Sequence, residues 1–181
     1  YEYLNQQKES DKRRKFIWGA VPRSGKSYMI GGLISKRHLD GTDNNILIIM
    51  GARTETEKQF EDELFNKFGD FEDYNIITSN TKTSEIDVDK KNIFLLSQEL
   101  FKANNASKNI DKTFAGTSKQ KQKFKLNDGF CKKYNIFEKN LDIYFDEIHK
   151  GAQEKNVQKD VMVLLQEELT RRELRIDLFV M

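Results

Sequence analysis

The amino-acid sequence predicts an α/β fold in which a parallel β-sheet carries helices on both faces. Apolar runs of strand length alternate along the chain with segments of helical periodicity, the pattern of repeated strand–helix–strand units. Residues 45–50 contain a continuous apolar run, as expected of a central parallel strand buried on both faces. The chain has 181 residues, the length of one ordinary domain, so we expect residues 1–181 to form a single domain.

The first predicted strand and helix occupy the N-terminal quarter of the chain. Residues 15–20 are predicted as a short buried strand, and residues 26–37 as a helix that ends near Asp40 and Gly41. Two glycines at 31–32 lie inside this helix, where each costs about 1 kcal/mol relative to alanine. We expect close packing of the helix on the sheet to explain them.

A second helix is predicted after the 45–50 strand. Thr54 and Glu57 have the spacing of a capping box, with Thr54 as the N-cap residue. The helix that follows has an apolar face made of Phe60, Leu64, Phe65 and Phe68.

The remaining predicted elements repeat the same alternation. Residues 74–78, 92–97 and 141–145 are predicted strands, and residues 176–180 are a last apolar strand. A long amphipathic helix is predicted before that last strand. Its apolar positions are Val157, Val161, Leu164, Leu165 and Leu169.

Residues 103–129 interrupt this alternation of strands and helices. They are poor in aliphatic residues and rich in Lys, Asn, Gln and Ser, which predicts an exposed, partly mobile insertion. Residues 119–125 form the best local basic patch, in which Phe124 can stack on a base while Lys121 and Lys123 follow the phosphates. A solvated insertion without a ligand explains the same composition more simply.

Composition and cysteine content limit the classes of function. The chain has 31 Lys+Arg and 29 Asp+Glu, so global charge does not indicate a polyanionic partner. Cys131 is the only cysteine, which excludes an internal disulfide and fits an intracellular compartment, cytoplasm or nucleus. The sequence has no signal peptide and no apolar run long enough to cross a bilayer, so no membrane partner is expected.

The segment 18–27, Trp-Gly-Ala-Val-Pro-Arg-Ser-Gly-Lys-Ser, lies between the first predicted strand and helix, where a phosphate-binding P-loop must be. Backbone N–H groups of such a loop curl around phosphates, so Gly25 stands where a Cβ would intrude. Lys26 supplies a charge to the β- and γ-phosphates, and the Ser27 hydroxyl is a hard oxygen ligand for Mg²⁺. The expected ATP-binding residues are Pro22, Arg23, Ser24, Gly25, Lys26, Ser27 and Tyr28.

This P-loop pattern has one defect. Ala20 occupies the position of the usual first glycine, and Gly19 comes one residue too early. A Gly-Lys-Ser turn that merely caps an ordinary helix is the alternative interpretation, and the strand before it and the helix after it argue against that.

A second motif follows the 141–145 strand. Asp146 and Glu147 come directly after that apolar strand, and His149 follows two residues later. Ligands of open parallel sheets bind beyond the carboxyl ends of the strands, so Asp146 is expected beside the P-loop, where it can hold Mg²⁺. Glu147 would then orient or deprotonate the water that attacks the γ-phosphate. Alone, such a pair is more often a solvated strand end; together with the P-loop it predicts a Mg-ATP site.

These motifs resemble those of the superfamily 2 helicases and translocases. Residues 20–27 are similar to motif I (Walker A), whose leading residue is often alanine, and residues 146–149 are similar to the DExH form of motif II. More loosely, residues 45–60 resemble the motif Ia region, and residues 92–100 resemble the strand and polar turn that often precede motif II. The resemblance covers nearly the whole chain as a first RecA-like domain.

The resemblance implies roles for particular residues. Lys26 and Ser27 would bind phosphate and metal, Asp146 and Glu147 would serve Mg²⁺ and water activation, and His149 would couple the nucleotide site to nucleic acid. Residues expected near a bound strand are Arg53, Ser97 and Gln98. Arg23 departs from the family, which commonly has glycine there. The family's adenine-reading glutamine is expected upstream, where Gln6 or Gln7 can serve.

The resemblance also suggests that the chain is a fragment. It lacks an initiator Met, and the strand matching residues 177–181 leads, in the family, into motif III. The second RecA-like domain, with its arginine finger, would then be missing, and such an arginine contributes roughly 10³–10⁵ in rate. We expect this chain to bind Mg-ATP but hydrolyse it weakly, and nucleic acid, DNA rather than RNA, to engage the full-length parent. The abundance of Lys, Asn and Ile is typical of an AT-rich genome, such as that of a virus or phage.

Two other classes of function remain open from the residues. A P-loop ATPase without a nucleic-acid partner, such as an assembly ATPase or a small-molecule kinase, would share the phosphate loop; a kinase would not need Glu147 and His149. A non-catalytic, nucleotide-dependent interaction module would not need an intact set of Lys26, Ser27 and Asp146.

Overall fold

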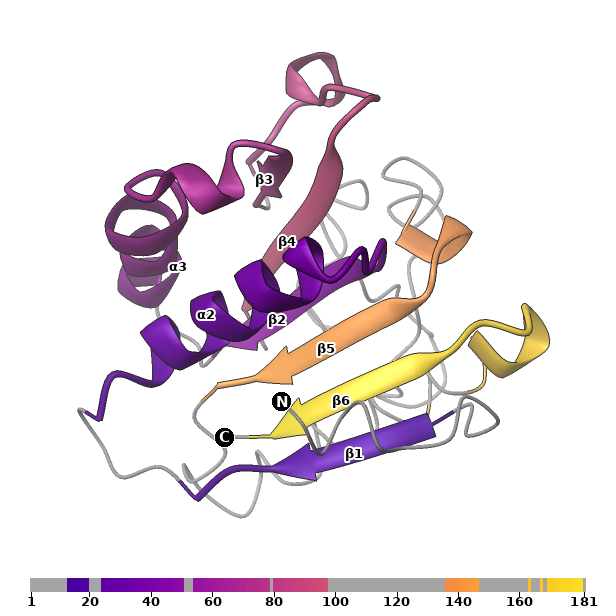
Figure 1. The fold of residues 1–181 in the computed structure, drawn as a ribbon. Helices are drawn as coiled ribbons and strands as arrows, with labels where there is room; N and C mark the ends of the chain where they lie inside the picture. The colour runs from indigo at the N-terminus through magenta and orange to yellow at the C-terminus, as the bar shows by residue number, and fades with distance from the viewer. Residues whose placement is uncertain are drawn as a thin grey trace, which may run out of the picture.

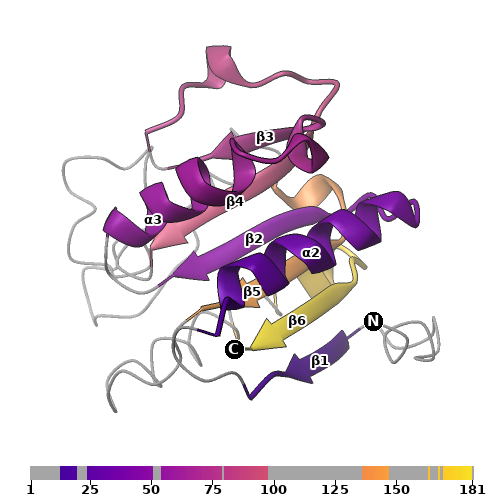
Figure 2. The same ribbon diagram turned by 60° about the vertical axis from the view of Figure 1, so that its left-hand side comes forward.

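The sheet is the centre of the fold. The computed structural model describes residues 13–19, 24–50, 54–78, 80–97, 136–146, 163, 167 and 169–180. Within them, one six-stranded sheet has the order β1-β6-β5-β2-β4-β3, and each neighbouring pair is parallel (Figures 1 and 2). The strands are β1 Arg13–Ile17, β2 Asn45–Met50, β3 Tyr74–Ile77, β4 Lys91–Ser97, β5 Leu141–Phe145 and β6 Ile176–Val180. The predicted parallel α/β sheet is confirmed.

The described helices α2 (Lys26–Leu39) and α3 (Thr54–Phe60) cover one face of this sheet, as Figure 2 shows. The helix α3 continues into the π-helix η1 (Glu61–Phe65), which is followed by the 3-10 turn η2 (Gly69–Phe71). Two more 3-10 turns lie in the described part of the chain, η3 (Thr83–Glu85) and η7 (Ile136–Glu138).

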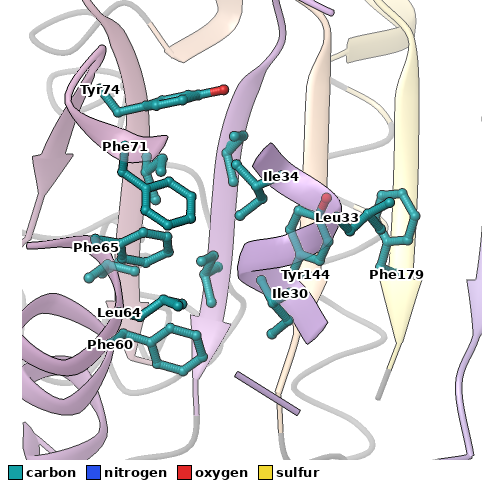
Figure 3. Close-up of a cluster of buried hydrophobic side chains, with 14 of the residues drawn as sticks. Ile30, Leu33, Ile34, Phe60, Leu64, Phe65, Phe71, Tyr74, Tyr144 and Phe179 are labelled. Atoms are coloured by element: carbon teal, nitrogen blue, oxygen red, sulfur yellow. The ribbon is translucent and has the colours of Figure 1, made fainter. Parts of the chain in front are cut away.

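Two hydrophobic cores result, one on each face. Residues Ile46 and Ile48 of β2 belong to the core beneath α2, α3 and η1, part of which Figure 3 shows. Their neighbours Leu47 and Ile49 belong to the opposite core, which also contains Leu169. Because successive strand residues point to opposite faces, a strand buried on both sides is apolar on both faces, which explains the uninterrupted run from Ile46 to Met50 in β2.

Most predicted boundaries agree with the structure. The strands β2 and β5 and the last strand β6 have the predicted bounds, and α2 extends two residues beyond the prediction before Gly41 adopts φ +80°. The predicted bounds of the first strand, residues 15–20, are wrong, because β1 covers residues 13–17. It is an edge strand whose pairing to β6 decides its limits, and sequence pattern alone does not show that pairing.

The second helix differs from its prediction in two ways. Thr54 is the first residue of α3 rather than a cap that precedes the helix. Phe60, Leu64 and Phe65 are buried as expected, but Phe68 is 41% exposed. The apolar face ends early because η1 has the wider π-helical turn and the chain leaves the helix at Asn66, which carries Phe68 off the predicted stripe.

The two glycines in α2 have different environments. A Cβ on Gly31 would lie 2.8 Å from Leu64 Cδ1, so Gly31 permits a close approach between α2 and η1. We expected these glycines to allow close packing of the helix on the sheet. For Gly31 that expectation is wrong, because the residue that it approaches, Leu64, belongs to the helix η1. A Cβ on Gly32 would meet no atom within 4 Å, and packing does not explain that glycine.

Several predictions lie outside the described residues. These include the 103–129 insertion and most of the long helix before β6, of which residues 169–171 are described as helical and Leu169 is fully buried. Among the described residues, no helix combines the length and apolarity that a bilayer crossing requires.

Candidate functional site

The two predicted motifs meet at the edge where the parallel strands end. The strands β1 and β5 run in the same direction, with β6 between them, so both point to the edge at which α2 begins (Figure 1). Asp146 follows β5 directly, and its backbone N–H donates to the Ile49 carbonyl of β2 at 3.0 Å. The arrangement is that of an open α/β sheet, whose ligands bind at the carboxyl ends of the strands.

The start of α2 is shaped as an anion site. Gly25 precedes the helix with φ +78°, a left-handed conformation that favours glycine. The Met29 N–H donates to the Gly25 carbonyl at 3.1 Å, closing the first turn. The N–H groups of Lys26, Ser27 and Tyr28 therefore point out of the helix end, where the helix dipole favours negative charge. No acidic residue lies in this first turn, which leaves its positive potential intact.

Lys26 and Asp146 bring the two motifs together. The Nζ atom of Lys26 lies 3.7 Å from Oδ1 of Asp146, and the side chains are only 12% and 8% exposed. At this separation the groups attract each other but are too far apart for a direct hydrogen bond. No short hydrogen bond between Lys26 and Asp146 has to break before a ligand binds. Lys26 can therefore contact an anionic group of the ligand, and Asp146 a cationic one.

A cavity of about 380 Å³ adjoins this pair. Its volume lies within the range of small-molecule sites. Of the residues predicted to bind ATP or metal, five line it: Gly25, Lys26, Ser27, Tyr28 and Asp146. Ser24, which precedes them, is exposed.

The opposite wall of the cavity was not predicted. It comes from α3 and η1 and consists of Thr56, Gln59, Glu63 and Leu64. The Gln59 side chain donates from Nε2 to Glu63 Oε2 at 3.3 Å. Three of these residues are polar and spaced three and four positions apart, next to the apolar row of the same helix. The polar row can be seen in the sequence. It points to a ligand-binding wall only once the fold shows that this helix faces the start of α2.

The residues present fit a Mg²⁺ ion bound together with phosphate. The Ser27 hydroxyl and the Asp146 carboxylate are hard oxygen donors on one cavity. Among the described residues, no group of three or more His, Cys, Asp or Glu could hold a metal by itself. A nucleotide-bound Mg²⁺ needs only one or two protein ligands, because phosphates and water supply the others.

The other predicted site residues lie elsewhere or are not described. Ser97 is the last residue of β4, which ends at the same edge of the sheet as β5. Outside the described residues are Pro22, Arg23, Arg53, Gln98, Lys121, Lys123, Glu147 and His149, together with Gln6 and Gln7.

A second polar cluster lies at the opposite end of α2. Arg37 donates from Nε and Nη2 to the two carboxylate oxygens of Asp142 at 2.7 and 3.1 Å, and from Nη2 to Asp177 at 2.9 Å. Asn44 donates to Asp142 at 2.7 Å, and all four residues are buried. Burial raises the pKa of Asp142 to about 6, since it outweighs the lowering by Arg37 and the neighbouring Asp177 adds to it. The cluster was not predicted, although two aspartates inside apolar strands call for a buried cation.

Comparison of the chain with known protein families, with curated proteins and with solved structures found no match. A lysine, a hydroxyl, a carboxylate and a helix N-terminus share one cavity at the carboxyl edge of a parallel sheet.

Proposed function

We propose that this chain is a P-loop, RecA-like domain that binds and hydrolyses Mg-ATP for a nucleic-acid-dependent helicase or translocase. One observation supports the nucleotide site above all others. Lys26 and Asp146 belong to two motifs far apart in the sequence, yet their charged groups lie 3.7 Å apart beside one cavity. The sequence motifs predict this meeting, and an unrelated Gly-Lys-Ser turn would have no reason to produce it.

The proposed binding mode follows from the chemistry of the lining. The phosphates would accept hydrogen bonds from the N–H groups of residues 26–28 and a charge-assisted bond from the Lys26 ammonium group. Ser27 and Asp146 would hold Mg²⁺, which neutralises phosphate charge when it is bound. Thr56 and Gln59, on the opposite wall, can donate hydrogen bonds to the same ligand.

Hydrolysis and the coupling to nucleic acid are supported by the family resemblance. Glu147 follows Asp146 directly and is the candidate for orienting the attacking water. His149 completes the DExH-like motif and is the candidate for coupling, with Arg53 and Gln98 as candidate nucleic-acid contacts.

Calorimetric titration with Mg-ATP tests the nucleotide site. The wild-type chain should bind, and Lys26→Ala should weaken binding by about 10- to 100-fold, as expected when a hydrogen bond to a charged group is lost. Glu147→Gln should retain binding and lose the residual turnover. Wild-type protein that binds no Mg-ATP, or a Lys26→Ala variant with unchanged affinity, would overturn the proposal.

Turnover measured with single- and double-stranded DNA and RNA tests the second half of the proposal. Nucleic acid should stimulate turnover, and Glu147→Gln should abolish that stimulation. Turnover that requires Glu147 but ignores every nucleic acid would favour the alternative, a P-loop ATPase with a protein or small-molecule partner.

A further inference from the structure

We propose that the ring of Tyr28 is the platform on which the nucleobase stacks. The inference rests on the proposed function. It gives a binding place to the base of a nucleotide whose phosphates would lie at Lys26 and Ser27. Tyr28 lines the cavity, yet 51% of its surface is exposed. An aromatic side chain used only for packing would bury most of its ring.

The cavity has an apolar part and a charged part, as a nucleotide has a base and phosphates. Of its described lining residues, only Tyr28 and Leu64 offer large apolar surfaces. The others apart from Gly25 are charged or polar: Lys26, Ser27 and Asp146, and Thr56, Gln59 and Glu63 of α3 and η1. Leu64 packs at Gly31, which lies three residues after Tyr28 and so on the same side of α2. The apolar part of the cavity therefore lies further along α2, and the charged part lies at the helix start, where Lys26 faces Asp146.

The order of groups along α2 matches the order of groups in a nucleotide. The N–H groups of Lys26, Ser27 and Tyr28 follow one another at the helix end, and phosphates bound there would extend along them. Because Tyr28 is the last of the three, its aromatic side chain, which lines the same cavity, follows the ribose end of phosphates bound in this order. A base that leaves the phosphates in this direction meets the Tyr28 ring.

A neighbouring aromatic residue holds the Tyr28 ring. The rings of Tyr28 and Phe68 are 6.2 Å apart between centroids and nearly perpendicular, at 81°. Phe68 is itself 41% exposed, and the Lys67 ammonium group lies 5.8 Å from its centroid. An edge-to-face contact favours one ring orientation and lowers the entropy lost when a ligand stacks on it. The exposed Phe68, which departs from the predicted buried stripe, thereby acquires a role.

The proposed platform recognises a chemical class rather than one base. Stacking on an aromatic ring tolerates any base, since every base has a π-face. Tyr28 should therefore contribute to the binding of purine and pyrimidine nucleotides alike. Discrimination between bases would need hydrogen bonds to base edges, the role that the family resemblance gives to an upstream glutamine.

The test compares ATP with inorganic tripolyphosphate, which has the phosphates but no base, both with Mg²⁺. The wild-type chain should bind ATP more tightly than tripolyphosphate. Tyr28→Ala should weaken ATP binding about five- to tenfold, the lower part of the range for base stacking, and leave tripolyphosphate affinity unchanged. Tyr28→Phe keeps the ring and should keep the ATP affinity. Thermal unfolding of each variant would show that the fold is retained.

A matched control is available on the same helix. Met29 is also a large exposed side chain, at 43%, but it does not line the cavity, so Met29→Ala should leave both affinities unchanged. Equal losses for ATP and tripolyphosphate in Tyr28→Ala, or equal wild-type affinities for the two ligands, would overturn the platform. Wild-type protein that binds neither ligand would instead overturn the proposed function itself, so the two failures are distinguishable.

Discussion

The two ends of α2 hold the same strand in different ways. At its C-terminal end, Arg37 makes two short hydrogen bonds to Asp142 of β5 and a third to Asp177 of β6, all of them buried. At its N-terminal end, Lys26 lies 3.7 Å from Asp146, just past the end of β5 and beside a cavity. One end is a closed network, and the other is an ion pair whose groups also face a ligand-sized space.

The difference follows from the two kinds of cation that α2 carries at its ends. A guanidinium with a bidentate carboxylate partner satisfies its donors in a fixed geometry, and such pairs suit a permanent contact. An ammonium group is a compact point charge on a flexible stem, which can leave one partner for another. Lys26 and Arg37 are separated by about 16 Å of helix, and Asp142 and Asp146 by about 13 Å of strand. The closed network therefore fixes the helix that carries Lys26.

Replacement of Arg37 should have the largest effect on stability. Arg37→Met leaves Asp142 and Asp177 buried without their cation, and we expect a loss of about 3–5 kcal/mol in the free energy of unfolding. Urea denaturation measures it. If the single variant does not fold, Arg37→Met combined with Asp142→Asn and Asp177→Asn should recover a folded protein, because no buried charge is then left unpaired.

Two lysines of the same helix provide the controls. Lys36 is exposed and pairs with Asp40 at 2.9 Å, so Lys36→Ala should cost no more than about 0.5 kcal/mol. Lys26→Ala should cost about 1 kcal/mol in unfolding free energy while it strongly weakens ATP binding. If Lys26→Ala lowers the unfolding free energy as much as Arg37→Met does, the two ends of α2 do not differ in their contribution to stability. The N-terminal end, which we call the open end, would then stabilise the fold as the closed network does.

The closed end should also give stability a dependence on pH. Burial, and then the repulsion of Asp177, raise the pKa of Asp142 to about 6 in the folded protein, although Arg37 opposes this. In the unfolded chain an aspartate titrates near 4. The folded state therefore binds this proton more tightly, and the stabilisation is complete below about pH 4 and is lost as the pH rises through about 6. Its size is on the order of 2–3 kcal/mol.

Asp142→Asn isolates this contribution from that of other groups. The difference in unfolding free energy between wild type and Asp142→Asn, measured by urea denaturation from pH 4 to pH 7, should change most between pH 4 and 6. Parallel stability curves over that interval would mean that Asp142 stays ionised and that the Arg37 network outweighs its burial.

The sequence predicted the sheet and the meeting of Lys26 with Asp146 for the same physical reason. A strand such as β2, buried on both faces, leaves a continuous apolar run, and the motifs that carry Lys26 and Asp146 are likewise short and local. Both signals are contained in a few consecutive residues. The closed end has no such signal, because Arg37, Asp142 and Asp177 come from three elements whose pairing only the fold defines. The cavity wall at Thr56 and Gln59 escaped prediction for the same reason.

The smallest predicted effect concerns the boundary of the closed network. Tyr144 lies between Asp142 and Asp146 on β5, and its ring stacks on Phe179 at 4.6 Å (Figure 3). Its hydroxyl group is buried and has no hydrogen-bond partner among the described residues. Tyr144→Phe keeps the stack and removes a buried polar group, so unfolding free energy should stay within about 0.5 kcal/mol of wild type or rise slightly.

Tyr144→Leu is the matched comparison, because it removes both the ring and the hydroxyl group. It should destabilise the protein by about 1–3 kcal/mol through the lost stack and altered packing. A loss above about 1 kcal/mol in Tyr144→Phe would show that the hydroxyl group belongs to the Arg37 network, which would then reach half-way along β5 towards Asp146. The closed and open ends of α2 would in that case be joined through one side chain rather than through the rigid helix alone.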